Sequence, residues 1–299
     1  MENKEILVSI GLPVYNGEKF IKEALDSVLA QTCTNFELII SDNASTDKTE
    51  AICREYQKRD PRIQYVRHDQ NRGGYFNFGY CVQKARGVYF TWLAHDDILE
   101  KRFLEEMADY LSKHDECVLA SGDFEFIDES SSHMYNLQLS KTRETLAWKY
   151  RCRELFKYPT TSKIYVLMYG LMRTEMIKKV HPDIFMIKMI KGSEMPLLCR
   201  IAEAGQIVSV PGILRKFRLY NESTCRAESL IINKKSALVK RYILFVNVCQ
   251  IRFDQARVLL RSRYPLPQKL YVLSSVYMEY FRNFLERLIR LPKKIWSYL

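Results

Sequence analysis

Apolar and polar positions follow two alternating periods along the first third of the chain. Short apolar runs of strand length recur, and between them lie longer segments whose apolar residues are spaced three and four apart, as on one helix face. The expected strands are residues 6–12, 36–40, 63–67 and 88–93, and the expected helices are residues 18–30, 47–59 and 75–85. Strands that alternate with helices predict a mostly parallel sheet covered by helices on both faces. The expected fold class is therefore α/β.

The rest of the chain is less regular, and its pattern predicts a mixture of helices and strands. The expected elements are a helix at 98–113, strands at 117–121 and 124–127, a serine-rich loop at 130–143, a helix from 194 to 204, and strands at 206–210 and 213–219. Further apolar stripes predict helices at 238–260 and 269–291. We therefore expect a domain at 1–225 and a basic, aromatic-rich helical extension at 226–299.

Carboxylates follow two of the expected strands. Asp42 lies just after the run at 36–40, and the adjacent pair Asp96 and Asp97 follows the run at 88–93. Ligands of open α/β sheets bind at the carboxyl ends of such strands. Adjacent carboxylates repel unless a cation offsets them, and a hard divalent cation takes oxygen ligands. Alternatively, Asp96 or Asp97 caps the helix expected to follow, since Asp is a favoured N-cap. These residues alone leave both interpretations open.

Charge is distributed unevenly along the chain. The formal net charge is +11, and residues 226–299 contain 15 Lys and Arg against 4 Asp and Glu, so the surplus lies in the extension. Its amphipathic helix at 269–291 fits either packing on the first domain or an anchor on anionic lipid. Nucleic acid is not expected as a partner, because the aromatic residues lie at helical core spacing and not between basic residues.

The cysteines and the apolar runs indicate the compartment. The 8 cysteines are scattered singly, without a C-x-x-C pair, which predicts reduced thiols in a cytoplasmic protein. The N-terminal residues lack a signal-peptide pattern, and no run reaches the roughly 18 apolar residues of a membrane span. Any membrane contact is expected at the inner face of the cytoplasmic membrane. Neither a G-x-G-x-x-G after the first strand nor a P-loop motif occurs, so a dinucleotide site is not supported.

Four ordered segments of the chain resemble the motifs of family 2 glycosyltransferases. They are VSIGLPVYN at 8–16, FELIISDNASTD at 36–47, NRG at 71–73 and WLAHDD at 92–97. The resemblance covers about residues 5–225. It implies the GT-A fold, which is Rossmann-like with a mostly parallel sheet, and a nucleoside diphosphate sugar as donor.

The resemblance also implies roles for individual residues. Pro13, Val14, Tyr15 and Asp42 would hold the nucleoside base, Asp96 the ribose or diphosphate region, and Asp97 the metal. Arg72 in the NRG segment, and Arg215 and Arg218 on an Arg-rich strand, would complete the donor site. The alternative for that strand is a solvated basic edge. His95 replaces an Asp found in many relatives, and this change bears on the affinity and identity of the metal. Tyr220 takes the place of an expected His, so any metal or phosphate contact that this His makes in relatives would be lost or replaced.

Glu194 is the candidate catalytic base. Inverting sugar transfer needs a carboxylate near the anomeric carbon that takes the proton of the acceptor hydroxyl. Family 2 enzymes resemble this stretch and place their base, more often Asp, at this position. A carboxylate in the first turn of a helix also has a structural explanation, because the helix dipole stabilises it.

These expectations combine into one function. The chain is expected to be an inverting, metal-dependent glycosyltransferase that uses Mg²⁺ or Mn²⁺. It would move a sugar from a nucleoside diphosphate sugar to a hydroxyl of a cell-surface glycan or lipid-linked acceptor. The alternatives are a catalytically inactive nucleotide-binding relative and a basic membrane-surface binding module. The joint presence of Asp42, Asp96, Asp97 and Glu194 favours the enzyme.

Overall fold

The structure is a computed structural model that describes residues 6–139, 163–184 and 194–219, together with residues 260, 266, 269 and 270. Its elements in chain order are β1 (Val8–Val14), α1 (Ile21–Leu29), β2 (Phe36–Asp42), α2 (Thr49–Arg59), β3 (Ile63–Arg67), α3 (Gly74–Lys84), β4 (Tyr89–Trp92), β5 (Ile98–Leu99), α4 (Phe103–Lys113), β6 (Cys117–Ile127), β7 (His133–Leu137), the 3₁₀ helix η2 (Lys163–Tyr169), β8 (Leu171–Arg173), α6 (Thr174–Ile184), α7 (Glu194–Ala204) and β9 (Gln206–Arg218). The alternation of strands and helices predicted for the first third of the chain is confirmed. Its first two helices begin two to three residues later than expected, at Ile21 and Thr49.

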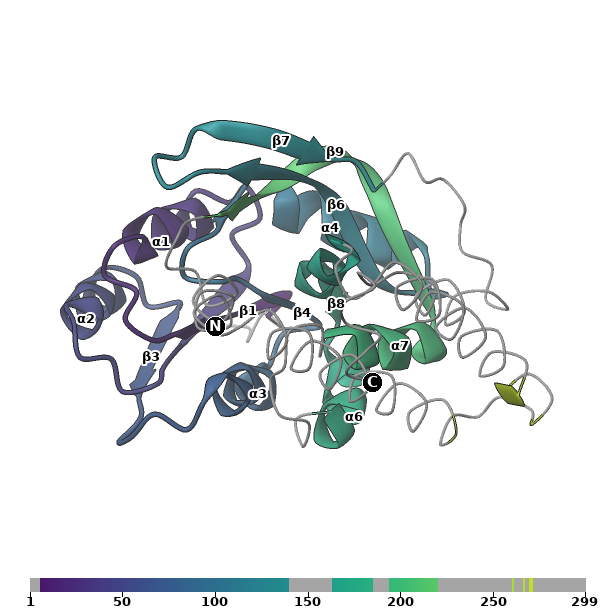
Figure 1. Cartoon of the computed structure of the whole chain (residues 1–299), viewed down its shortest axis with the longest axis horizontal. Helices are drawn as coiled ribbons and strands as arrows, with labels where there is room; N and C mark the ends of the chain where they lie inside the picture. Colours follow the sequence, from purple (N-terminus) through teal and green to yellow (C-terminus); the bar gives the residue numbers. More distant parts are fainter. Residues whose placement is uncertain are drawn as a thin grey trace, which may run out of the picture.

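One sheet runs through the described residues in the order β3-β2-β1-β4-β8-β6-β9-β5, and β7 pairs with β6 (Figure 1). The first four strands in this order are parallel. β8 is antiparallel to both of its neighbours, β4 and β6. The register sets Val14 opposite Asp42 and Gly11 opposite Trp92. The carboxyl ends of β1, β2 and β4 therefore meet at one edge of the sheet.

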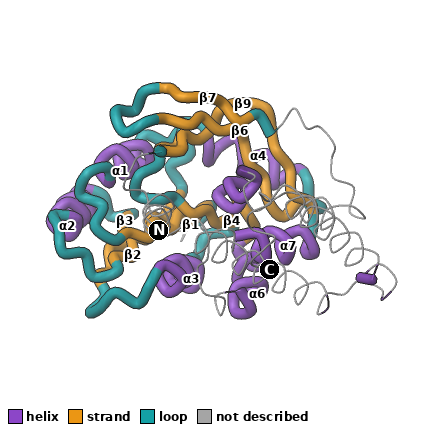
Figure 2. The backbone as a smooth tube through the Cα atoms, viewed as in Figure 1, coloured by secondary structure: helices purple, strands orange, loops and turns teal. Residues whose placement is uncertain are grey.

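Helices cover both faces of this sheet (Figure 2). On one face, α3, α6 and α7 enclose a core that includes Ile39, Phe90 and Trp92. On the other face, α1, α2 and α4 cover a core that includes Leu38 and Ile40. Successive residues of β2 thus point to opposite cores, as the period of two in a strand requires. Each such side chain stabilises the fold by roughly 1.5–3 kcal/mol when it is fully buried.

Several expectations for the middle and the end of the domain are wrong. Residues 98–99 form the strand β5, which pairs with β9, and the helix expected from residue 98 begins only at Phe103. The two strands expected at 117–127 are one strand, β6, which contains a buried Asp123. The two strands expected at 206–219 are likewise one strand, β9. Register shifts in the β6–β9 pairing accommodate Asp123 within β6. A positive φ of 122° at Gly212 lets the Pro211–Gly212 pair lie within β9. Part of the expected serine-rich loop is the strand β7.

Some predictions fall on residues that the structure does not describe. These are the rest of that loop from residue 140, the boundary after residue 225, Tyr220, and the helices expected at 238–260 and 269–291, apart from residues 260, 269 and 270. They stay predictions. Among the helices that are described, none has the length and apolar character needed to cross a membrane.

Candidate active site

The candidate site lies where β1, β2 and β4 end. The N–H of Leu93 donates to the carbonyl of Gly11 at 2.9 Å, and the N–H of Asn43 donates to the carbonyl of Val14 at 2.9 Å. The segments that leave these strands therefore stay together beyond the strands themselves. Parallel pairing thus brings Tyr15, the loop after β2 and the acidic segment 93–97 to the same edge, as the sequence predicted.

Asp42 shapes the loop that follows β2. Its buried carboxylate accepts a hydrogen bond from the hydroxyl of Tyr65 at 2.6 Å and another from the N–H of Ser45 at 2.8 Å. The hydroxyl of Ser45 in turn accepts the N–H of Asn16 at 2.9 Å. Both oxygens of Asp42 therefore have a partner inside the protein. Asp42 fixes the loop beside Tyr15, and its contact with a nucleoside base stays a prediction.

The other residues predicted at the base and diphosphate differ in exposure. Pro13 and Val14 are buried within β1, whereas the side chain of Tyr15 is 45% exposed at the end of that strand. Arg72 lies in the loop before α3, with its guanidinium carbon 4.8 Å from the centre of the Phe76 ring. Tyr15 and Arg72 therefore present side chains to solvent, while Pro13 and Val14 contribute main chain and core packing.

Asp97 is the most unusual carboxylate of the site. The residue is only 2% exposed, and one oxygen, Oδ1, accepts the main-chain N–H of Arg218 at 3.1 Å. The other oxygen, Oδ2, is buried and has no hydrogen-bond partner within the described part of the chain. Burial, and then the charge of neighbouring Asp96, raise the pKa of Asp97 well above its ordinary value. An unpartnered buried carboxylate oxygen beside a second carboxylate fits a ligand of a divalent cation.

The capping interpretation of these carboxylates is wrong. Helix α4 begins at Phe103 and the residue before it is Arg102, so β5 separates the helix from Asp96 and Asp97. Residues 98–99 become a strand because β9 supplies a pairing partner that local sequence cannot reveal. The two carboxylates therefore do not serve α4.

The guanidinium of Arg215 contacts the last residues of β4. It donates to the carbonyl of Trp92 at 2.8 Å and to the hydroxyl of Thr91 at 3.2 Å. Burial lowers the pKa of Arg215 to about 10, and the nearby charge of Asp97 acts in the opposite direction. The solvated-edge interpretation of this strand is wrong, because Arg215 and Arg218 are 1% and 3% exposed. Strand β9 is paired on both sides, by β6 and β5, and is not an edge there. Contact between Arg215 and a diphosphate stays a prediction.

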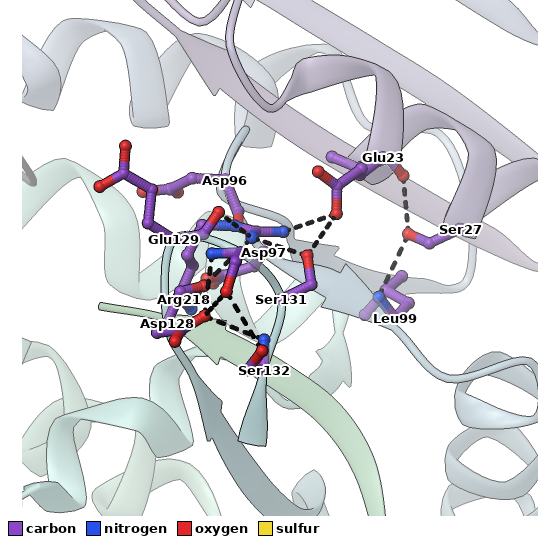
Figure 3. A network of polar contacts seen from close by, with 12 residues as sticks. Glu23, Ser27, Asp96, Asp97, Leu99, Asp128, Glu129, Ser131, Ser132 and Arg218 are labelled. Atoms are coloured by element: carbon purple, nitrogen blue, oxygen red, sulfur yellow. Dashed lines mark hydrogen bonds and ion pairs between the residues drawn. The ribbon is translucent and has the colours of Figure 1, made fainter. Parts of the chain in front are cut away.

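Arg218 is the centre of a polar network that surrounds the acidic segment (Figure 3). Its Nε donates to the carbonyl of Asp96 at 2.9 Å, and its Nη2 donates to a carboxylate oxygen of Glu23 at 2.7 Å. Its Nη1 donates to the hydroxyl of Ser131 at 2.9 Å. Sequence reasoning missed Glu23 and Ser131, since one lies on the polar face of α1 and the other in a turn, and neither position carries a signal for this contact.

His95 links the acidic segment to the turn after β1. A Cβ on Gly17 would lie 2.7 Å from Cδ2 of His95 and 2.7 Å from Cγ2 of Val14, so the ring rests directly against this glycine. The N–H of Gly17 donates to the hydroxyl of Thr49 at 2.8 Å. His95, one of the two positions at which the chain departs from the expected motifs, is thus part of the packing that joins β1 to the segment after β4.

The remaining acidic candidates have different positions. Glu194 is the first residue of α7, as expected, but its side chain lies outside the described part of the structure, and its role as base stays a prediction. An isolated Asp beside an expected strand is most often a turn residue, and this holds for Asp128, which accepts the N–H groups of Ser130 at 2.8 Å and Ser132 at 2.9 Å. The same expectation is wrong for Asp123, which is buried inside β6.

A model of the family described as Glycosyl transferase family 2 matches residues 9–180, which is more than half of the chain. The chain belongs to this family. The match includes every strand end described above and stops before α7 and β9, which supply Glu194, Arg215 and Arg218.

Relatives within the glycosyltransferases differ in how much of the chain they match. An uncharacterised glycosyltransferase of Rickettsia typhi is 38% identical over 43% of this chain and 40% of its own length. An uncharacterised glycosyltransferase of Methanocaldococcus jannaschii is 29% identical over 80% of this chain and 78% of its own length. Glycosyltransferase GlyG of Streptococcus pneumoniae is 29% identical over 58% of this chain and 59% of its own length. The chain thus spans well under two thirds of the Rickettsia typhi relative and most of the Methanocaldococcus one.

Solved structures support the fold. S. aureus TarS 1–349 in complex with UDP superposes with a TM-score of 0.64 at 18% identity, over 92% of this chain and 72% of that chain. The same protein in complex with UDP-GlcNAc gives a TM-score of 0.65 at 16% identity, over 91% and 71% of the two chains. The family 2 chain therefore has the GT-A fold predicted from its sequence.

Proposed function

We propose that this chain transfers a glycosyl group from a nucleoside diphosphate sugar to an acceptor hydroxyl, with inversion at the anomeric carbon and with help from a divalent cation. The observation that carries the proposal is the buried Oδ2 of Asp97, which has no hydrogen-bond partner among the described residues and lies beside Asp96 at the carboxyl end of β4. Membership of family 2 and the likeness to TarS structures in complex with UDP and UDP-GlcNAc support a nucleotide-sugar donor.

The carboxylates fit a cation that is held partly by substrate. Within residues 6–139, 163–184 and 194–219, no cluster of three His, Cys, Asp or Glu side chains is placed to enclose a metal. Mg²⁺ is commonly bound through one or two carboxylates and substrate phosphates, without a full protein cage. Asp97, with Asp96 beside it, would hold Mg²⁺ or Mn²⁺ against the donor diphosphate. Bound there, the cation would offset the charge that develops on the leaving diphosphate.

The chain's own residues would divide the remaining work. Tyr15, Arg72 and the loop fixed by Asp42 would orient the nucleoside. Glu194 would accept the proton of the acceptor hydroxyl as that oxygen forms its bond to the anomeric carbon. The bond from the anomeric carbon to the diphosphate oxygen breaks in the same step, and the nucleoside diphosphate leaves with the electron pair. Attack from the face opposite the leaving group inverts the centre.

The acceptor is proposed to be a hydroxyl of a cell-surface glycan or a lipid-linked sugar. This fits an enzyme that works at the inner face of the cytoplasmic membrane, with the basic extension 226–299 at an anionic lipid surface. The competing possibility, a catalytically inactive nucleotide-binding relative, differs in one property. It would bind the donor but release no nucleoside diphosphate when acceptors are supplied.

A thermal-shift panel of nucleoside diphosphates with and without Mn²⁺ tests the proposal. A ligand that binds only the folded state raises the melting temperature. We expect at least one nucleoside diphosphate to raise it, and to do so more strongly with Mn²⁺. UDP is the first probe because TarS structures hold it. If no nucleoside diphosphate shifts the transition in either condition, the proposed donor class is wrong.

A further inference from the structure

The side chain of Arg218 is sealed from solvent, with 0% of its surface exposed. In addition to its bonds to Asp96, Ser131 and Glu23, its Nη1 lies 3.2 and 3.3 Å from two main-chain carbonyl oxygens in the turn at 128–131. A donor diphosphate in the site cannot reach a guanidinium that is enclosed in this way. Direct donor contact, which the family resemblance implied for this residue, therefore does not fit the geometry.

The bonds of Arg218 join segments that are far apart in the chain. Its main-chain N–H donates to Oδ1 of Asp97, while its Nε donates to the carbonyl of Asp96, so one residue holds both aspartates. The same guanidinium reaches the turn at 128–131 and helix α1 (Figure 3). The side chain of Arg218 thus ties the acidic segment, through the carbonyl of Asp96, to this turn and to α1.

Glu23 provides the counter-charge that the enclosed guanidinium needs. One of its oxygens, Oε2, accepts both Nη2 of Arg218 at 2.7 Å and the hydroxyl of Ser131 at 2.9 Å. The ring of Phe20 lies 4.4 Å from the guanidinium carbon and covers one face of it. Removing the partner of a buried charge strongly destabilises the folded protein. The enclosed position of Arg218 therefore depends on Glu23.

We propose that Arg218 is a positioning residue, which holds the Asp96–Asp97 segment in the geometry that binds a divalent cation together with a diphosphate, and which does not contact the donor. The inference rests on the proposed function. Residues that orient metal ligands typically change metal affinity by roughly 10–100-fold when they are replaced. Loss of a direct phosphate contact would instead weaken donor binding with and without metal.

The test uses Arg218→Met, Arg218→Lys and Glu23→Gln in the full chain. Arg173→Met is the matched control, since Arg173 also binds carbonyl oxygens, those of Cys117 at 2.9 Å and Leu111 at 2.8 Å, but at the opposite end of β4. The first readout is amide hydrogen exchange at residues 94–99 and 128–132 without any ligand. The second is the Mn²⁺ concentration that gives half of the UDP-dependent thermal shift.

We expect Arg218→Met to speed exchange in both segments and to raise the required Mn²⁺ concentration about 10–100-fold, with UDP binding in the absence of metal unchanged. Arg218→Lys and Glu23→Gln should have the same effects at smaller size, and they carry the test if Arg218→Met does not fold. The Arg173 control should lower stability without changing the Mn²⁺ requirement.

Three results would overturn the inference: unchanged exchange at 94–99, a normal Mn²⁺ requirement despite faster exchange, or an equal loss of UDP binding with and without metal. The last result would restore direct donor contact. Wild-type protein that gives no shift with any nucleoside diphosphate speaks against the proposed function alone, because the exchange measurement still decides whether Arg218 holds the acidic segment.

Discussion

Replacing Asp97 by Asn should make the ligand-free protein more stable while it removes metal-assisted donor binding. The amide has nearly the same shape as the carboxylate, and its oxygen can still accept the N–H of Arg218. What disappears is a negative charge at a buried position, one oxygen of which has no partner among the described residues. The substitution therefore distinguishes the effect of the buried charge on folding stability from its role in metal-assisted donor binding.

The sign of the effect on stability follows from the direction of the pKa shift of Asp97. Burial and Asp96 raise the pKa of Asp97, and this net direction already includes the attraction of Arg215 and Arg218. The unfolded-state pKa of Asp is about 3.9, so the folded state binds more protons in the range above it. The stability linked to Asp97 is present below that value and is lost as pH rises through the folded-state pKa. A buried polar group without a partner costs roughly 1–3 kcal/mol, and a charged group costs more. The amide nitrogen that replaces Oδ2 keeps the cost of a neutral group, so Asp97→Asn removes only the additional cost of the charge. We expect the substitution to raise the free energy of unfolding at neutral pH by on the order of 1 kcal/mol.

Urea denaturation at a series of pH values measures this effect. The advantage of Asp97→Asn should be full at neutral pH and should disappear as pH approaches about 4. Asp128→Asn is the control, because hydrogen bonds from Ser130 and Ser132 lower the pKa of Asp128. Its sign is opposite: the stability it contributes is present above the unfolded-state pKa and is lost as pH falls. That variant should therefore be less stable than wild type at neutral pH.

Thermal shift with UDP completes the experiment. Wild type should need Mn²⁺ for its full response, and Asp97→Asn should respond equally weakly with and without it. If the ligand-free variant is less stable than wild type, the attraction of Arg215 and Arg218 for the Asp97 carboxylate outweighs its cost of burial. The expected gain in stability would then be wrong. An unchanged Mn²⁺-dependent response would remove Asp97 from the metal site.

Three further predictions address other parts of the molecule. Glu194→Gln should keep metal-dependent UDP binding and lower nucleoside diphosphate release in the presence of acceptor by roughly 10²–10⁴-fold, whereas near-normal turnover would place the base elsewhere. Gly17→Ala puts a Cβ 2.7 Å from the ring of His95, so UDP affinity measured by calorimetry should fall, and an unchanged affinity would mean that the ring moves without the acidic segment. If residues 269–299 bind membrane, each Lys or Arg near the surface contributes about 1 kcal/mol. Flotation with anionic vesicles at low salt should then be strong for the full chain and weaker for a chain that ends at Arg290, and failure of both to float would make the extension a purely structural appendage.

Local pattern was sufficient for the first half of the sheet. Strands β1 to β4 are short apolar runs separated by amphipathic helices, and crossover connections leave little choice but a parallel sheet. The shared edge of Tyr15, Asp42 and Asp97 follows from that topology, since parallel strands end on the same side. Family motifs then added roles that the topology alone does not supply.

The second half depends on pairing between distant segments, which local pattern does not report. Ile98 lies in a strand only because Lys216 pairs with it. Asp123 lies within a strand because β6 continues through a register shift against β9. The solvated edge was the alternative to a donor-site role for Arg215, and local pattern could not exclude it, because arginine is almost never fully buried unless it is paired. Its burial depends on a strand paired on both sides and on a carboxylate from a different segment.

The arginines of β9 also stabilise the buried carboxylate of Asp97 in the absence of a ligand. The carboxylate of Asp97 accepts the N–H of Arg218, which lies 121 residues later in the chain. Arg215 adds a positive charge nearby. These groups offset part of the cost of the buried carboxylate, yet its pKa stays raised, so the compensation is incomplete. A site neutralised fully by its own arginines would have little affinity for a cation. Asp97 therefore keeps an unfavourable charge that a divalent cation would offset. Because the cation would bind only the folded state, the free energy of unfolding would then rise with the logarithm of the cation concentration once that concentration exceeds the dissociation constant.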